Sequence, residues 1–320
     1  MELYPLIFEP ILKERIWGGT KLKTDLGKNI PNDITGESWE LSDVPGDMSV
    51  VKNGAYAGKP LIELLKAHPE AVLGDKVYDR FGLHFPLLFK FLDAHNDLSI
   101  QVHPNDELAK KRHNSFGKTE MWYVMQADEG AKIIVGFKED SSPEEYLKHL
   151  DDKNLIEILN EVEVNEGDVF FLETGTIHAI GAGIVIAEIQ QTSDITYRIY
   201  DWDRVDANGN SRELHVENAL DAMNYKVSNT KKEYTSIPNT SNAVVDCPYF
   251  TTKYLPLKGE MVIEKEGDSF TTYICTDGEY TVIINDVVYN FKKGDTILIP
   301  AALKQYTLSG EATLLEIYIA

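Results

Sequence analysis

The sequence predicts a mainly β protein made of two β-barrel or β-sandwich units with a few peripheral helices. Most of the 320 residues form short apolar runs separated by Gly, Asp and Asn turns. The apolar fraction of 43% is sufficient for a real core in each unit. A weak repeat relates EGDVFFLETGTIHAI (166–180) to KGDTILIPAALKQYT (293–307) and sets His178 opposite Gln305. Because Gly-Asp turns before strands are common, chance similarity is the alternative explanation.

Four segments interrupt the strands with apolar residues at helical spacing. A proline after His68 should break the first helix. Asn105 or Asp106 is a suitable N-cap for the second. The third opens with Ser142 as N-cap and Pro143 at the first helical position, and then resembles two short helices. The four segments are 59–74, 105–113, 141–162 and 213–225.

A polar stretch after Tyr225 has no strong periodicity and is the best candidate for a linker. We therefore predict a larger domain over residues 1–228, a linker over 229–242, and a smaller β domain over 243–320. The aligned repeat suggests that this smaller domain kept the β framework and lost the histidine.

Composition narrows the class of partner. The chain has 31 Lys and Arg against 52 Asp and Glu, a formal net charge of −21. Such a surface repels phosphate backbones and anionic lipid, so we expect no nucleic-acid or membrane partner. The N-terminal segment lacks the basic-then-apolar order of a signal peptide. With only Cys247 and Cys275, we expect free thiols and a cytoplasmic protein.

Four side chains could converge on one metal ion. Gln101 and His103 stand two apart in an alternating strand, so they leave the same face. Glu120 starts an aromatic-rich strand, and His178 follows a turn at the start of another. Two imidazoles, a carboxylate and an amide suit Zn²⁺, and this set leaves room for water or substrate. A lone histidine at a strand end is usually solvated or hydrogen-bonded, so His103 and His178 qualify only in combination.

The segment FPLLFKFLDAHNDLSIQVHPND (85–106) closely resembles the signature of type I mannose-6-phosphate isomerases. ERIWGG (14–19) and SDITYR (193–198) resemble further family segments, and the likeness runs from about residue 5 to residue 200. The chain is similar to the short bacterial form, which implies two cupin units. The resemblance also implies one Zn²⁺ per chain. The family's metal ligands match Gln101, His103, Glu120 and His178.

The implied reaction interconverts mannose 6-phosphate and fructose 6-phosphate through an enediolate, which needs a base and stabilisation of negative oxygen. Arg198 matches the family's catalytic arginine. We favour Lys118 for proton transfer, with its pKa lowered by a nearby dication and an arginine; metal-bound water is the rival base. The family's HKPE motif reads GKTE here, so Gly117 replaces a histidine and cannot be the base.

Ser99 and Lys90 match family positions implicated in binding the phosphate end of the substrate. Lys90 also interrupts an apolar run, where a charge is costly without a partner. Its alternative role is a strand residue whose amine reaches water. Two other functions fit the fold: a metal-dependent cupin oxygenase, and a sugar-binding cupin without catalysis. The sequence leaves the oligomeric state open.

Overall fold

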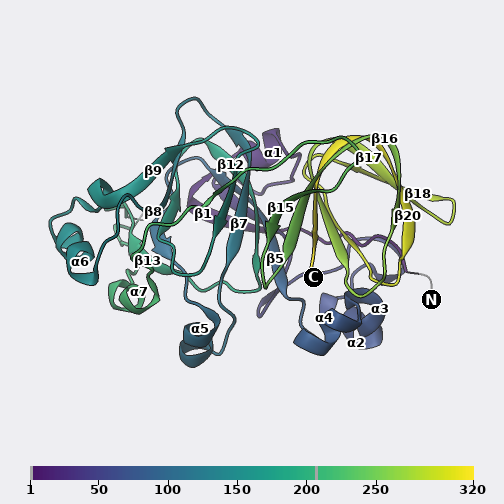
Figure 1. Ribbon diagram of the computed structural model, residues 1–320, viewed down its shortest axis with the longest axis horizontal. Coiled ribbons are helices and arrows are strands. Elements are labelled where there is room, and N and C mark those ends of the chain that lie inside the picture. The colour runs from purple at the N-terminus through teal and green to yellow at the C-terminus, as the bar shows by residue number, and fades with distance from the viewer. Residues whose placement is uncertain (1–2, 206–207) are drawn as a thin grey trace.

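The structure, a computed structural model, describes residues 3–205 and 208–320. It confirms a mainly β protein with peripheral helices (Figure 1). Two β units lie side by side along the long axis, the first drawn mostly in purple to teal and the second in green to yellow. No helix among the described residues is long and apolar enough to cross a membrane.

The first unit contains a seven-stranded and a five-stranded sheet. The seven-stranded sheet consists, in spatial order, of β1 (Ile11–Gly19), β2 (Thr35–Leu41), β5 (Leu87–Ala94), β12 (Ile184–Gln191), β7 (Glu120–Ala127), β10 (Val169–Leu172) and β14 (Lys231–Lys232). The five-stranded sheet consists of β13 (Tyr197–Tyr200), β6 (Ile100–Val102), β11 (His178–Ile180), β8 (Lys132–Phe137) and β9 (Leu159–Glu163). A small ribbon pairs β3 (Asp43–Val44) with β4 (Asp47–Met48). Strand β14 lies within the predicted linker and pairs with β10.

The alternation of strand β7 explains how one strand serves two cores. Successive side chains of a strand point to opposite faces. Trp122 and Val124 therefore enter a core between the two sheets of the first unit. Met121 and Tyr123 enter a second core, which also contains residues of the C-terminal unit. The two β units are thus joined by buried apolar contact.

The second unit is one six-stranded sheet. Its strands are β15 (Asn242–Asp246), β16 (Thr251–Glu264), β20 (Gln305–Tyr318), β17 (Thr271–Ile284), β18 (Val287–Lys292) and β19 (Thr296–Ile299), with β19 paired to β17. The expected equivalence of His178 and Gln305 is off by one residue. Gln305 is exposed and bonds to Glu264, whereas the next residue, Tyr306, points into the core. Both cysteines are free thiols, as expected.

Most expected helices form, and each is short. The break at His68 separates two helices, and the side chains of Asn105 and Ser142 cap the helices that follow them. The second expected helix of 141–162 is only a 3₁₀ turn, Leu155–Ile158, that leads into β9. The helices are α1 (Lys21–Thr24), α2 (Leu61–Ala67), α3 (Pro69–Leu73), α4 (Asp75–Phe81), α5 (Asp106–His113), α6 (Pro143–Asp151) and α7 (Val216–Ala222), with a further 3₁₀ turn at Gly54–Tyr56.

Candidate metal centre and active site

Strand pairing brings the four predicted metal ligands together. His178 on β11 lies directly opposite Gln101 on β6, and the two side-chain nitrogens are 3.2 Å apart. His103 follows β6, and Glu120 opens β7. The Nε2 atoms of His103 and His178 each lie 3.5 Å from a different carboxylate oxygen of Glu120. These three residues form a buried group whose potential ligand atoms lie within 4.8 Å of one another.

The surrounding backbone fixes which nitrogen of each histidine faces inward. His103 Nδ1 bonds to the carbonyl oxygen of Ile195 at 2.9 Å, and His178 Nδ1 bonds to that of Thr176 at 2.8 Å. Each Nδ1 therefore carries the proton and donates, which leaves a lone pair on Nε2. Both carboxylate oxygens of Glu120 are buried, and their polar contacts among the described residues are the long ones, 3.4–3.5 Å, to Lys118, His103 and His178. An inward set of lone pairs with an unsatisfied carboxylate fits a divalent cation.

Burial shapes the protonation of this group. It lowers the pKa of His178 to about 4 and that of His103 well below its usual value. Burial and the charge of Glu188 together raise the pKa of Glu120 to about 7. Both imidazoles are thus neutral at pH 7, the form that binds metals.

Lys118 lies beside the four ligands, just before β7. Its Nζ is 3.1 Å from His103 Nε2 and 3.4 Å from a carboxylate oxygen of Glu120. The lowered pKa that we predict for Lys118 requires a bound dication beside it. Burial does act in that direction, but the charges of Glu120, Glu188 and Glu37 outweigh it and raise the pKa of Lys118.

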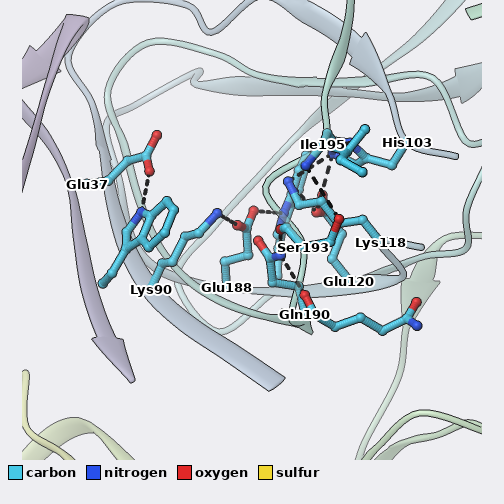
Figure 2. A network of polar contacts seen from close by, with 12 residues as sticks. Glu37, Lys90, His103, Lys118, Glu120, Glu188, Gln190, Ser193 and Ile195 are labelled. Carbon is cyan, nitrogen blue, oxygen red and sulfur yellow. Dashed lines mark hydrogen bonds and ion pairs between the residues drawn. The ribbon is translucent and has the colours of Figure 1, made fainter. Parts of the chain in front are cut away.

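A second buried ion pair lies next to this group, as Figure 2 shows. Lys90 on β5 pairs with Glu188 on β12 at 3.0 Å, and both side chains are about 5% exposed. The other carboxylate oxygen of Glu188 accepts a bond from Trp122 Nε1 at 3.0 Å. The charge of Lys90, which the sequence marked as costly, is therefore balanced by Glu188.

A third carboxylate, Glu37 on β2, stands at the same cavity. It accepts hydrogen bonds from Trp39 Nε1 at 2.6 Å and from Arg15 Nε at 2.7 Å. Burial alone would raise its pKa, but the charges of Lys90 and Arg15 and these hydrogen bonds lower the pKa to about 2. Glu37 is therefore ionised at every physiological pH.

These groups line one cavity of about 640 Å³. Its wall includes Gln101, Lys118 and His178, as well as the other predicted site residues Ser99, Lys90 and Arg198. Four arginines also line it: Arg15, Arg198, Arg204 and Arg212. Burial and the neighbouring charge of Arg212 lower the pKa of Arg198. The cavity thus concentrates positive charge in a strongly acidic chain.

The structure adds residues that the sequence analysis missed. Glu188 lies in the middle of the apolar run IVIAEIQQ. A charged residue inside an apolar run is the same signal that drew attention to Lys90, and it could have identified Glu188 as well. Arg204 and Arg212 come from a polar loop after β13, where the buried carboxylate of Asp201 binds both guanidinium groups. Nothing in the local sequence distinguishes these arginines from solvated loop residues.

Known proteins resemble this chain over its full length. The family model for the catalytic domain of phosphomannose isomerase type I matches residues 6–132, and the model for the mannose-6-phosphate isomerase cupin domain matches residues 239–319. Mannose-6-phosphate isomerase ManA from Bacillus subtilis (strain 168) is 40% identical over 98% of each chain. The mannose-6-phosphate isomerase of Streptococcus mutans is 37% identical over 97% of each chain.

A solved structure agrees with these sequence matches. The crystal structure of the mannose 6-phosphate isomerase from Bacillus subtilis has a TM-score of 0.90 to this chain. The two share 35% sequence identity, and the alignment covers 98% of this chain and 99% of the other. With sequence and fold both shared from end to end, this chain belongs to the type I mannose-6-phosphate isomerase family, a family of enzymes.

Proposed function

We propose that the protein is a zinc-dependent isomerase that interconverts mannose 6-phosphate and fructose 6-phosphate through an enediolate. The observation that carries this proposal is the buried group His103, Glu120 and His178, with Gln101 beside it, at one arginine-rich cavity. The cavity has room for a sugar phosphate, and family membership supplies the reaction class.

The four side chains would hold one Zn²⁺ per chain. Bound there, the ion would supply Lewis-acid stabilisation for negative charge on the substrate oxygens. The neutral amide of Gln101, in place of a second carboxylate, keeps the net charge of the site positive. A positive site favours the enediolate oxygen over the neutral carbonyl, which is the difference that accelerates the reaction.

Lys118 is our candidate for the group that moves the proton between C1 and C2. Its amine is held by His103 and Glu120 at the cavity wall, so it is positioned before substrate binds. The raised pKa in the metal-free protein keeps this amine protonated at pH 7. Beside a dication, Lys118 would release its proton more easily, because like charges disfavour the ammonium form.

The phosphate end of the substrate requires uncompensated positive charge. We propose that Ser99 and Lys90 contact the substrate along the wall, as the sequence suggests. Glu188 balances the charge of Lys90, and Glu37 balances that of Arg15.

We therefore assign the main attraction for the phosphate dianion to Arg198, together with the one surplus charge of Arg204 and Arg212, which share the carboxylate of Asp201. Guanidinium groups bind phosphate through paired N–H donors. Arg198 would also stabilise the enediolate charge.

Three further proposals follow from the sequence. Residues 1–228 form the catalytic unit, residues 229–242 connect it, and residues 243–320 form the second cupin unit. The protein acts in the cytoplasm on a small sugar phosphate.

Metal analysis combined with an isomerase assay tests the function. Purified protein should contain about one zinc per chain, and chelation should abolish conversion of mannose 6-phosphate until Zn²⁺ is restored. His103→Ala should lose both metal and activity, whereas His95→Ala, an exposed histidine in the loop before β6, should keep both. Arg198→Ala should keep the metal and lose turnover. Full activity after complete removal of metal would refute zinc dependence, and full activity of Arg198→Ala would refute the role of that residue.

A further inference from the structure

One buried carboxylate holds two of the arginines that line the substrate cavity. Asp201 directly follows β13 and is only 5% exposed. Its Oδ1 atom accepts hydrogen bonds from Arg204 Nη2 at 2.6 Å and from Arg212 Nη2 at 2.5 Å. Its Oδ2 atom accepts a third bond, from Arg212 Nε at 2.7 Å. Arg212 is therefore held by two parallel bonds, which fix the plane of its guanidinium group.

Backbone carbonyl groups orient the remaining donors of these arginines. Arg204 Nη1 donates to the carbonyl oxygen of Asp97 at 2.6 Å. Arg198 Nη1 donates to the carbonyl oxygen of Glu213 at 3.0 Å, and Glu213 directly follows Arg212 in the chain. One short segment thus fixes two of the three arginines. Because a carbonyl oxygen carries no net charge, these bonds orient the guanidinium groups without neutralising them.

The three arginines retain an excess of positive charge. Among residues 3–205 and 208–320, Asp201 is the only carboxylate in an ion pair with any of them. Asp194 also lines the cavity, but it is exposed and therefore screened by water. Three positive charges and one buried negative charge leave an excess of two, which is close to the charge of a phosphate monoester at pH 7.

Asp201 has two opposing effects on an anion in this cavity. Burial alone would raise the pKa of Asp201, but the hydrogen bonds and charges of Arg212 and Arg204 lower it, so the carboxylate is ionised at pH 7. Its negative charge weakens the attraction for phosphate. Its hydrogen bonds order two long side chains before the ligand arrives, which removes the entropy cost of ordering them during binding.

We propose that Asp201 is a positioning residue of the phosphate site: it raises the affinity for the phosphate end of the substrate by holding Arg204 and Arg212 in one orientation, although it lowers the positive charge of the cavity. The inference rests on the proposed function for the identity of the ligand. Two guanidinium groups in a fixed geometry can donate to phosphate oxygens without first losing conformational freedom. Ordering therefore outweighs the charge that Asp201 removes.

Two variants separate orientation from charge. Asp201→Asn raises the net charge of the cavity by one, and Arg212→Lys keeps the charge but loses the parallel pair of bonds. We expect each to raise the KM for mannose 6-phosphate at least tenfold and to change kcat by less than about threefold. Asp203→Asn should change neither constant. It removes the same charge from an exposed position of the same loop, and asparagine tolerates the left-handed backbone there.

Charge alone predicts the opposite results. Asp201→Asn would then lower the KM, and Arg212→Lys would leave it unchanged, and either outcome refutes the proposal. A loss of kcat at unchanged KM also refutes it, because that pattern indicates a general structural defect. If Asp201→Asn does not fold, Arg212→Lys decides alone, since Asp201 keeps its bond from Arg204 in that variant.

Glucitol 6-phosphate keeps this proposal separate from the proposed function. The compound has the phosphate group but no carbonyl group to isomerise, so calorimetric titration measures binding without turnover. If the unmodified protein lacks isomerase activity, the proposed function fails. The role of Asp201 is still decided by whether Asp201→Asn and Arg212→Lys bind this probe at least tenfold more weakly than the unmodified protein. Equal binding by all three proteins, or no binding by the unmodified protein, refutes it.

Discussion

Glu37 is a buried carboxylate that the fold keeps ionised at the edge of the substrate cavity. Its pKa of about 2 lies below the ordinary value of 4.5, since Lys90 and Arg15 overcome the effect of burial. A depressed carboxyl pKa stabilises the folded state above pH 4.5, and the benefit disappears as pH falls from 4.5 to 2. A difference of this size corresponds to about 3 kcal/mol at pH 7.

We therefore predict that Glu37→Gln lowers the free energy of unfolding by about 3 kcal/mol at pH 7. The difference from the unmodified protein should shrink by about half at pH 3, because the native carboxylate is then losing its advantage. Urea unfolding at the two pH values measures this. A difference that stays constant with pH would show that Glu37 contributes through packing or hydrogen bonds and not through its charge.

At the residue scale, the sequence identified site residues where a polar or charged side chain interrupts a pattern of apolar residues. Gln101 and His103 stand out on an alternating strand, and Lys90 stands out in an apolar run. The lowered pKa of Lys118 beside a dication stays a prediction, because without the cation its pKa is raised. Three carboxylates gather around its amine, and two of them, Glu37 and Glu188, come from strands distant in sequence. No local pattern contains that information.

Strand pairing is the element-scale feature that assembles the site. Strands β5 and β12 pair in register along their full length, which sets Lys90 directly opposite Glu188. Both side chains are buried, so removing either one leaves an uncompensated charge in the protein interior. Removing one partner of a buried pair typically costs 3–5 kcal/mol, about as much as a large core truncation.

We predict that Glu188→Gln and Lys90→Met each lower the free energy of unfolding by about 3 kcal/mol or more. The double variant should cost clearly less than the sum of the two, since neither charge is then left buried alone. Chemical denaturation of the four proteins gives this cycle. Additive losses would mean that Lys90 and Glu188 do not stabilise each other.

Element boundaries were predictable where caps and prolines mark them. Asn105 and Ser142 cap helices as their side-chain chemistry suggests. The helix expected near residue 155 is only a 3₁₀ turn, because the chain there enters strand β9 and pairs with β8. Tertiary pairing overrides local helical spacing in such a segment. Strand pairing also explains why the repeat placed Gln305, and not Tyr306, opposite His178. The register of the paired strands decides which side chain faces the core, and sequence similarity does not contain that register.

At the scale of the whole molecule, one apolar core joins the two β units. Phe85, at the start of β5, packs against Phe270, just before β17, with ring centroids 4.7 Å apart. Both side chains are fully buried in the core that also contains Met121 and Tyr123 of β7. The sequence predicted two units but not this contact between them. The alternation of apolar residues in a strand shows that a face is buried, but it does not show which other element packs against that face.

The shared core predicts that the two units unfold together. All four tryptophans lie in the first 228 residues, whereas the buried thiol of Cys275 lies in the C-terminal unit, so two probes report separately. The experiment uses the Cys247→Ser variant, in which Cys275 is the only thiol. Thermal unfolding of this variant should give the same midpoint by tryptophan fluorescence and by reactivity of the Cys275 thiol. Phe270→Leu should cost about 1–2 kcal/mol, as a shape change in a packed core does, and should lower both midpoints equally. If only the thiol midpoint fell, the C-terminal unit would be unfolding by itself, and the apolar contact would join the units without making them cooperative.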